Sequence, residues 1–327
     1  MIKYSIIVPA YNAGNTIKGC LSAAVNQSIS RDDYEVIVVD DGSTDGTGDM
    51  VKKFPVKYIC QPNRGPASAR NHGARGAIGK IILFTDSDCV PAYKWVEEMT
   101  KPFEKPDVIA VKGAYKTNQR SLIARLVQTE FEERFEMLKR SESIDMVDTY
   151  SAAFRRDIFW QAGGFDESFP VANNEDTDLS YKLSSAGYKM VFNPEAIVYH
   201  LRHPDTLLRY ARQKFWRGYW RMVVYKRFPK KMVKDAYTPQ SLKFQILFLF
   251  SIVPFLVLSA LLEVGLYFAI LLFVAFVIST LPFSLSAMKR DFLAGSMSPF
   301  FLATRALSIG LGVLYFFYRQ IGDTVKN

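Results

Sequence analysis

Short apolar runs alternate with longer mixed segments through the N-terminal third of the chain. The strand-like runs, rich in Val, Ile and aromatic side chains, lie at 4–8, 35–39, 56–60 and 80–85. The segments with a helical pattern between them lie around 14–28, 45–53, 66–77 and 92–102. This alternation predicts an α/β fold in which a parallel sheet is covered by helices.

Polar or Gly/Pro-containing segments begin where three of these strands end. They are 9–12 (PAYN), 40–43 (DDGS) and 86–88 (DSD). Open α/β sheets bind their ligands at the carboxyl edge of the strands. The sequence therefore predicts a ligand site at this edge.

The C-terminal third has a different pattern, because charged residues become sparse. No charged residue occurs in 244–262 or in 264–288, and each segment is long enough to cross a bilayer. A third apolar segment, at about 299–318, has Arg305 as its only charged residue. Arg305 lies near one end of the segment, and we expect its side chain to reach the headgroups. The sequence predicts membrane helices at about 242–262, 264–286 and 299–318.

A helical pattern from about 203 to 228 precedes these segments. One face is expected to carry Leu207, Leu208, Ala211, Phe215, Tyr219 and Met222. The other is expected to carry Arg209, Lys214, Arg217 and Arg221, with Trp216 and Trp220 flanking. This pattern suits a helix lying in a membrane interface, and equally a helix packed on the α/β domain with its basic face in water.

The formal charge of +9 comes from one segment. Residues 206–243 hold 11 Lys and Arg against one acid, Asp235, so the rest of the chain is close to neutral. Because this block directly precedes apolar segments, it favours contact with anionic lipid headgroups and argues against nucleic acid as a partner. The chain thus divides into an α/β domain (1–202), a basic amphipathic juxtamembrane segment (203–241) and a transmembrane region (242–327).

The N-terminus lacks the long apolar run of a signal peptide. The three cysteines occur singly, which favours a reducing compartment. The positive-inside rule places the basic block and Lys289-Arg290 in the cytoplasm and the turn at Glu263 outside. We therefore expect an integral protein of the cell membrane with its N-terminus and α/β domain in the cytoplasm.

Several motifs, in this order and spacing, resemble family 2 glycosyltransferases of the A-type fold. They are IIVPAYNAGNTIKGCLSAAVNQS, VIVVDDGSTDGT, NRGPASARNHG, FTDSDCV, GGFDE and NEDTDLSYKLSSAGY. The resemblance covers about residues 4–200. It implies a mixed, mostly parallel nucleotide-binding sheet flanked by helices, and transfer of a sugar from a nucleotide-sugar donor.

The Asp86-Ser87-Asp88 motif follows a predicted strand, and its two carboxylates are suited to a hard divalent cation, Mg²⁺ or Mn²⁺. Such a cation stabilises a departing diphosphate. The resemblance implies that Asp86 also contacts the donor, and that Pro9, Tyr11, Asp41 and Arg70 bind the nucleotide. For Asp40 and Asp41, the alternative to nucleotide binding is that they start a turn and cap a helix, which suits Asp40 better than Asp41. For Arg70, the alternative to nucleotide binding is a structural role.

The NNEDTD run is predicted to open a helix capped by Asn173 or Asn174. By the resemblance, Asp176 is the base that deprotonates the acceptor and Glu175 supports it, although both could simply face the helix dipole. His200 is expected to complete the metal shell, or to be a structural histidine. Gly164 and Asp166 would lie on the acceptor side, while a helix C-cap is the alternative for the glycines.

One motif departs from the family's processive polysaccharide synthases, which carry Gln-x-x-Arg-Trp. Here Gln213, Trp216 and Arg217 occur out of that register, which favours a single transfer per encounter. The prediction is an inverting, non-processive glycosyltransferase that uses a UDP- or GDP-sugar and a membrane-associated acceptor, a hydroxyl of a lipid-linked saccharide. The alternatives are a polyprenyl phosphate acceptor and, from another class, an inactive membrane scaffold.

Overall fold

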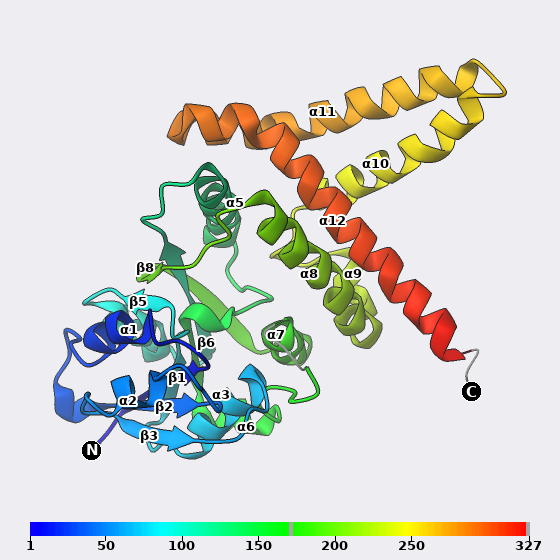
Figure 1. The fold of residues 1–327 in the computed structure, drawn as a ribbon. Coiled ribbons are helices and arrows are strands. Elements are labelled where there is room, and N and C mark those ends of the chain that lie inside the picture. The colour runs from blue at the N-terminus through cyan, green and yellow to red at the C-terminus, as the bar shows by residue number, and fades with distance from the viewer. Residues whose placement is uncertain (170–172, 325–327) are drawn as a thin grey trace. The chain divides into compact units, whose positions relative to one another are not determined.

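The computed structural model describes residues 1–169 and 173–324 (Figure 1). It contains two compact units, each described by itself below. Unit 1 comprises Met1–Asn118 and Phe135–Arg202, and unit 2 comprises Gln119–Arg134 and His203–Asn327. The helix α5 (Leu122–Lys139) contributes residues to both units. The domain boundaries expected from the sequence stay a prediction.

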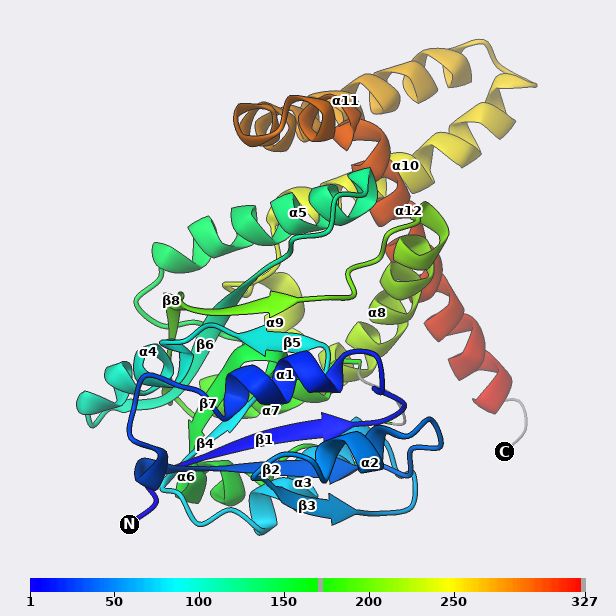
Figure 2. The same cartoon turned by 60° about the vertical axis from the view of Figure 1, so that its left-hand side comes forward.

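Unit 1 is built on an eight-stranded sheet with the order β3-β2-β1-β4-β7-β6-β8-β5. Its strands are β1 (Tyr4–Ala10), β2 (Tyr34–Asp40), β3 (Lys57–Cys60), β4 (Ile81–Phe84), β5 (Cys89–Pro91), β6 (Val108–Lys116), β7 (Ala152–Arg155) and β8 (Lys189–His200). Strands β3, β2, β1 and β4 pair in parallel, as do β6 and β8. Figure 2 shows β1, β2 and β3 running side by side in one direction.

Strand β1 shows why the sheet needs helices on both faces. Its consecutive residues Ile6, Ile7 and Val8 are all fully buried, although successive side chains of a strand point to opposite faces. Burial on both faces is typical of the parallel part of an α/β sheet. One covering helix, α3 (Pro66–Arg75), approaches so closely that a Cβ at Gly73 would lie 2.5 Å from Ile7 Cγ2.

The predicted fold class is confirmed. The four predicted strands correspond to β1–β4, and the sheet is mixed because β7 pairs antiparallel with β4 and β6, and β5 pairs antiparallel with β8. The other helices of unit 1 are α1 (Ile17–Ala24), α2 (Thr47–Val51), α4 (Trp95–Thr100), α6 (Arg156–Gln161) and α7 (Glu175–Ser185).

Unit 2 is helical. Its remaining helices are α8 (Leu207–Arg227), α9 (Pro229–Val233), α10 (Gln240–Ser259), α11 (Val264–Arg290) and α12 (Phe292–Thr324). Helices α10 and α11 form a hairpin whose turn contains Glu263, and α8 lies beside α12 (Figure 1). Two glycines permit this second contact, since a Cβ at Gly218 would overlap the Ile309 carbonyl and a Cβ at Gly312 that of Phe215.

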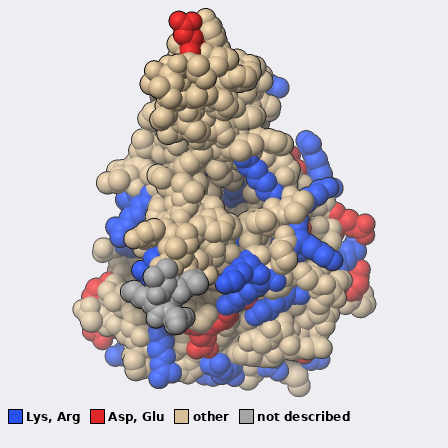
Figure 3. All heavy atoms as spheres, turned by 90° about the vertical axis from the view of Figure 1, so that its right-hand side faces the viewer, with Lys and Arg blue, Asp and Glu red and all other residues tan. Residues whose placement is uncertain are grey.

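Among the described residues, three helices are long and apolar enough to cross a membrane, as expected. They are Gln240–Ser259, Val264–Arg290 and Phe292–Gly322, with mean hydropathies of 2.1, 2.5 and 1.7. Figure 3 shows the corresponding outer part of unit 2 as a surface nearly free of Lys, Arg, Asp and Glu. The third helix begins at Phe292, before the predicted start of the segment at about 299, and Pro299 lies inside the helix.

The face assignment for α8 was wrong. Lys214, expected on a water-facing or lipid-facing basic side, is only 2% exposed, whereas Leu208, expected on the apolar side, is 80% exposed. The cause is an ion pair: Lys214 Nζ donates to both carboxylate oxygens of Glu130 at 2.8 and 2.9 Å. A paired charge can be buried where an unpaired one cannot.

The expectation that Arg305 reaches the headgroups was also wrong. Its side chain is 4% exposed and donates to Gln245 Oε1 of α10 at 2.9 Å, with Glu130 Oε1 at 3.5 Å from its guanidinium. An ionisable group inside an apolar helix is stabilised by such internal partners. Arg305 therefore joins α12 to α10 and to the middle of α5.

Candidate active site

A cavity of about 530 Å³ lies at the carboxyl ends of β1, β2 and β4 in unit 1. Its walls include every residue predicted for the nucleotide and the metal, namely Pro9, Tyr11, Asp41, Arg70, Asp86, Asp88 and His200. Tyr11 is half exposed, so its ring face is available for stacking on a base. The structure brings these residues together, while their individual roles stay predictions.

Asp41 organises one wall of this cavity. Its buried carboxylate accepts hydrogen bonds from the backbone N–H groups of Arg64 (2.9 Å) and Gly65 (2.8 Å) and from Gln61 Nε2 (2.7 Å). These bonds hold the loop after β3 against the end of β2. Asp40 instead accepts from the Ser43 N–H and the Tyr58 hydroxyl, which agrees with the turn-forming alternative for that residue.

Arg70 connects the cavity to α7. Its buried guanidinium donates to Asp86 Oδ1 through Nη2 and to Glu175 Oε1 through Nη1, both at 2.7 Å. It reaches them from α3, which begins at Pro66 after Gly65, a glycine with φ of +90°. Arg70 therefore holds a predicted metal ligand and a predicted catalytic acid at fixed positions.

Negative charge exceeds positive charge around Arg70. Burial, together with the charge of Asp176, raises the pKa of Glu175 to about 7 even though Arg70 opposes the shift. Burial also raises the pKa of Asp88, with Asp86 adding to the shift and His200 opposing it. Three carboxylates, Asp86, Glu175 and Asp176, thus share the neighbourhood of the Arg70 guanidinium, and a divalent cation would offset this surplus.

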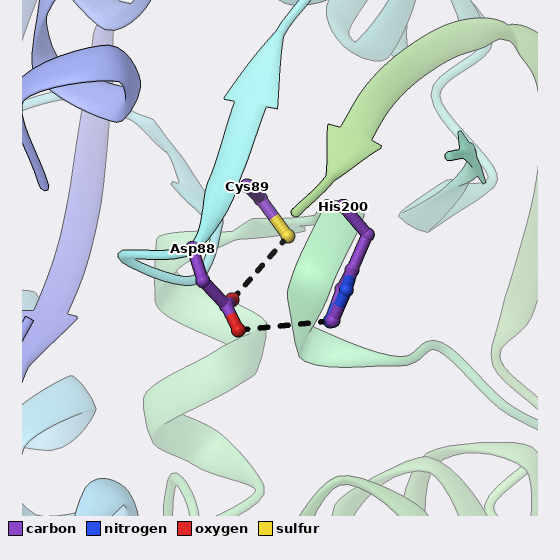
Figure 4. Close-up of side chains that lie close together, drawn as sticks. All are labelled: Asp88, Cys89 and His200. Atoms are coloured by element: carbon purple, nitrogen blue, oxygen red, sulfur yellow. Dashed lines mark hydrogen bonds and ion pairs between the residues drawn. The ribbon is translucent and has the colours of Figure 1, made fainter. Parts of the chain in front are cut away.

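Asp88, Cys89 and His200 form a small cluster at the junction of β5 and β8 (Figure 4). Asp88 Oδ2 lies 3.9 Å from His200 Nε2, and Cys89 Sγ lies 3.8 Å from Asp88 Oδ1. Burial raises the pKa of the Cys89 thiol well above its ordinary value. Asp88, Cys89 and His200 each offer one atom that could bind a metal ion.

The residues fit a hard divalent cation, since Asp86 and Asp88 present carboxylate oxygens to one cavity. His200 is less ready to bind. Its Nδ1 accepts the Arg202 N–H at 3.2 Å, which leaves the proton of the neutral ring on Nε2, the nitrogen nearest Asp88. Coordination through Nε2 requires the other tautomer and the loss of that hydrogen bond.

Glu175 and Asp176, the predicted catalytic pair, lie in the first turn of α7, as expected. Glu175 is buried, and its hydrogen bond with Arg70 links it to the cavity. Asp176 is half-buried, and its carboxylate accepts hydrogen bonds from the Thr177 N–H at 2.7 Å and the Thr177 hydroxyl at 3.3 Å. Asn174 precedes the helix with φ of +67°. The assignment of Asp176 as base and Glu175 as its support stays a prediction.

Gly163 and Gly164 end α6. Both have positive φ, and their N–H groups donate to the carbonyls of Trp160 and Phe159, which agrees with the C-cap alternative. Asp166 Oδ1 accepts the Ser168 N–H, so it begins the following turn. The acceptor-side roles predicted for Gly164 and Asp166 stay predictions beside these local ones.

The remaining acceptor-side candidates, Gln213, Trp216 and Arg217, belong to unit 2. Gln213 is exposed, Trp216 packs against Phe215 and Tyr315, and Arg217 lines a second cavity within that unit. Their predicted contact with an acceptor stays a prediction.

Sequence reasoning missed several residues that line the unit 1 cavity, namely Asn12, Thr16, Asn63, Gly65, Ala69 and Arg202. Asn63 and Gly65 stand in the NRGPASAR run and could have been found, because a Gly-Pro pair before a helix indicates a fixed loop. Cys89 carried no such signal, since a lone cysteine after D-x-D is as well explained by core packing.

Comparison with known proteins places the N-terminal part of the chain in a described family. Residues 5–163 match the family described as glycosyl transferase family 2. Residues 5–163 are a domain of that family. The family assignment made from the motifs is thereby confirmed.

Two curated relatives carry related domains. Glycosyltransferase AglE of Haloferax volcanii is 28% identical over 209 residues, 61% of this chain and 67% of that protein. The probable glycosyltransferase YdaM of Bacillus subtilis is 30% identical over 239 residues, 67% of this chain and 53% of that protein. For several such relatives, the chain spans only about half of their length.

A solved structure resembles nearly the whole chain. The mannosyltransferase PcManGT from Pyrobaculum calidifontis, in complex with GDP-Man and Mn²⁺, is 22% identical with a TM-score of 0.64. The match covers 97% of this chain and 87% of that one. At this identity the likeness shows a shared fold, which includes the helical C-terminal part.

For this family 2 domain, we expect Asp86→Asn and Asp88→Asn each to weaken Mn²⁺ binding by at least about tenfold, because loss of a metal site's outer contacts alone typically has that effect. Calorimetric titration of Mn²⁺ in the presence of UDP or GDP measures it. The matched control is Asp49→Asn, on an exposed acid of α2 outside the cavity. Unchanged Mn²⁺ affinity in both site variants would refute the assignment.

Glu175 should make stability depend on pH in the metal-free protein. Its folded pKa of about 7 lies above the ordinary 4.5, so the folded state binds the proton more tightly. The stabilisation is complete below pH 4.5 and is lost as the pH rises towards 7. Relative to Glu175→Gln, the wild-type Tm should fall across that window in chelator. The exposed Glu104→Gln is the control, and parallel Tm profiles of wild type and Glu175→Gln would contradict the expectation.

Proposed function

We propose that this protein is an inverting glycosyltransferase that moves a sugar from a UDP- or GDP-sugar to a membrane-associated acceptor. The observation that carries the proposal is the Arg70 bridge. It joins Asp86 of the nucleotide and metal cavity to Glu175 of the acid pair on α7, so that donor groups and a candidate base share one neighbourhood.

On the donor side, Tyr11 and Asp41 hold the nucleoside, and Arg70 neutralises charge near the diphosphate. Asp86 and Asp88 hold Mg²⁺ or Mn²⁺, joined by His200 if its tautomer changes. When bound, such a cation supplies electrostatic stabilisation of the departing nucleoside diphosphate. GDP-mannose is the first donor to test, since the similar PcManGT was solved with GDP-Man and Mn²⁺.

On the acceptor side, Asp176 removes the proton of the attacking hydroxyl and Glu175 supports it. Direct attack on the anomeric carbon inverts its configuration. The displaced Gln213, Trp216 and Arg217 motif favours one transfer per encounter. The intact acid pair also argues against an inactive scaffold, since a protein that only binds has no need of a base.

The acceptor is proposed to be lipid-linked, because the chain carries three helices that could cross a membrane and a strongly basic segment before them. The positive-inside rule places unit 1 in the cytoplasm and the helices in the cell membrane. Two acceptor chemistries compete. A saccharide hydroxyl requires a base, whereas a polyprenyl phosphate is already ionised at neutral pH.

One experiment separates these possibilities. The full-length protein in bilayers receives labelled GDP-mannose, other GDP-sugars or UDP-sugars, with either a polyprenyl-linked saccharide or a polyprenyl phosphate. We expect label to enter the lipid-linked saccharide, and Asp176→Asn to lower turnover by about 10²- to 10⁴-fold while donor affinity survives. Asp49→Asn serves as the control for loss of an unrelated carboxylate.

Three outcomes would contradict parts of this proposal. Transfer to polyprenyl phosphate that is insensitive to Asp176→Asn would assign the alternative acceptor. Loss of donor binding in that variant would move Asp176 to the donor site. Absence of both transfer and donor hydrolysis with every donor would favour the scaffold.

A further inference from the structure

Asp88, Cys89 and His200 bring three different donor atoms together at the unit 1 cavity (Figure 4). One carboxylate oxygen, the thiol sulfur and one imidazole nitrogen all lie within 4.8 Å of one another. Asp88 stands between the other two, with Oδ1 at 3.8 Å from Cys89 Sγ and Oδ2 at 3.9 Å from His200 Nε2. The donor site proposed above gives no role to the sulfur of this cluster.

The backbone holds the cluster in place. Cys89 is the first residue of β5 and His200 is the last residue of β8, and the two residues are direct partners in the antiparallel ladder. The side chains of such a pair lie on one face of the sheet, with their Cβ atoms about 4.5 to 5.5 Å apart. The Leu201 N–H also donates to the Asp88 carbonyl at 2.9 Å, which keeps Asp88 beside the pair. The three donor groups are therefore preorganised before any ligand binds.

The separations between the donor atoms are close to those of a tetrahedral zinc site. Zinc binds sulfur at about 2.3 Å and nitrogen or oxygen at about 2.0 to 2.2 Å, so neighbouring ligand atoms lie about 3.3 to 3.7 Å apart. The distances of 3.8 and 3.9 Å in the cluster exceed this range only slightly. Because the Asp88 and His200 side chains are only partly buried, small rotations of them can supply the difference.

The chemistry of the donor set favours zinc over the harder cations. Mg²⁺ and Mn²⁺ prefer oxygen ligands, whereas thiolate and imidazole ligands suit Zn²⁺. Asp86 lies outside the cluster, and its Oδ1 accepts a hydrogen bond from Arg70 at 2.7 Å. Three protein ligands with an open fourth position are also the usual arrangement of a zinc site that admits water or substrate. The cluster is thus a mixed set of sulfur, nitrogen and oxygen.

Charge balance also favours a zinc ion at this place. Cys89 is fully buried, and the side chains of His200 and Asp88 are 20% and 26% exposed. A thiolate and a carboxylate together neutralise Zn²⁺, so the complete site buries no net charge. The zinc ion displaces the thiol proton as it binds, and that proton leaves to solvent.

Binding requires one rearrangement at His200. Its Nδ1 accepts the Arg202 N–H at 3.2 Å, so coordination through Nε2 moves the ring proton to Nδ1 and gives up that hydrogen bond. Arg202 is an exposed residue, so water can replace the lost partner.

We propose that Asp88, Cys89 and His200 bind Zn²⁺, and that zinc thereby excludes the Mg²⁺ or Mn²⁺ of the donor site, with which it shares Asp88. The inference rests on the proposed function and adds to it regulation by a competing metal ion. Its zinc-binding part depends on the cluster alone and is measured without any sugar transfer.

The test uses the full-length protein in detergent, freed of metal with a chelator. Co²⁺ is the coloured substitute for Zn²⁺, because a cobalt–thiolate bond gives an intense charge-transfer band, and Zn²⁺ affinity is measured by competition with a chromophoric chelator. We expect the cobalt–thiolate band in the wild type and its loss in Cys89→Ser. Cys89→Ser should weaken Zn²⁺ binding by at least about tenfold more than Mn²⁺ binding, since even contacts outside a metal's own ligands contribute that much.

The other two cysteines provide the controls. Cys20 is also fully buried, and its Sγ lies 3.6 Å from the Asp86 carbonyl oxygen, but it is outside the cluster. Cys60 is exposed. Cys20→Ser and Cys60→Ser should both keep the cobalt–thiolate band and the Zn²⁺ affinity. A titration of GDP with Mn²⁺ shows whether the cavity of each variant is intact.

Electron paramagnetic resonance measures the exclusion of Mn²⁺, because free Mn²⁺ gives a sharp signal that is lost on binding. Zn²⁺ added to the wild-type complex with GDP and Mn²⁺ should restore the free Mn²⁺ signal. Cys89→Ser should require at least about tenfold more Zn²⁺ for the same release, in proportion to its weaker zinc binding.

Several outcomes would overturn the inference. They are the absence of a cobalt–thiolate band in the wild type, a band that persists in Cys89→Ser, equal effects of Cys89→Ser and Cys20→Ser, and zinc binding that releases no Mn²⁺. The proposed function fails separately: zinc binding that depends on Cys89, in a protein that transfers no sugar, would support the zinc site and reject the glycosyltransferase activity.

Discussion

The site in unit 1 depends on one buried cation. Arg70 lies among more carboxylates than it can neutralise, and its two hydrogen bonds fix Asp86 and Glu175 on opposite sides of its guanidinium. Replacing it by an apolar residue would leave buried acids without a partner, which is among the most destabilising changes in a protein interior. The same surplus of negative charge around Arg70 makes the neighbourhood attractive to a divalent cation.

Unit 2 shows the reverse arrangement of charge. Its buried centre is an acid, Glu130, surrounded by Lys214, Arg305 and Arg134. Arg70 in unit 1 thus lies among acids, whereas Glu130 in unit 2 lies among basic side chains.

The sequence predicted unit 1 well because its determinants are local. Each of β1, β2 and β4 ends in a short polar segment, and parallel strands bring such ends to one edge whatever the rest of the chain does. It predicted unit 2 less well, since a helical wheel assumes that apolar side chains are buried. Lys214 reverses that rule through Glu130, which lies 84 residues away, and Arg305 does so through Gln245, 60 residues away. No periodicity within α8 or α12 contains that information.

The same reasoning explains why the sequence motifs indicate the cavity of unit 1 and not the helix packing of unit 2. The cavity is lined by short loops, and the three hydrogen bonds that Asp41 accepts from residues 61–65 form one of its walls from two neighbouring segments. Unit 2 instead depends on helices brought together by long-range packing, as α8 and α12 are through Gly218 and Gly312. These two glycines lie on different helices, so no short motif contains both. The loops of unit 1 are therefore visible in the sequence as motifs, whereas the helix contacts of unit 2 are not.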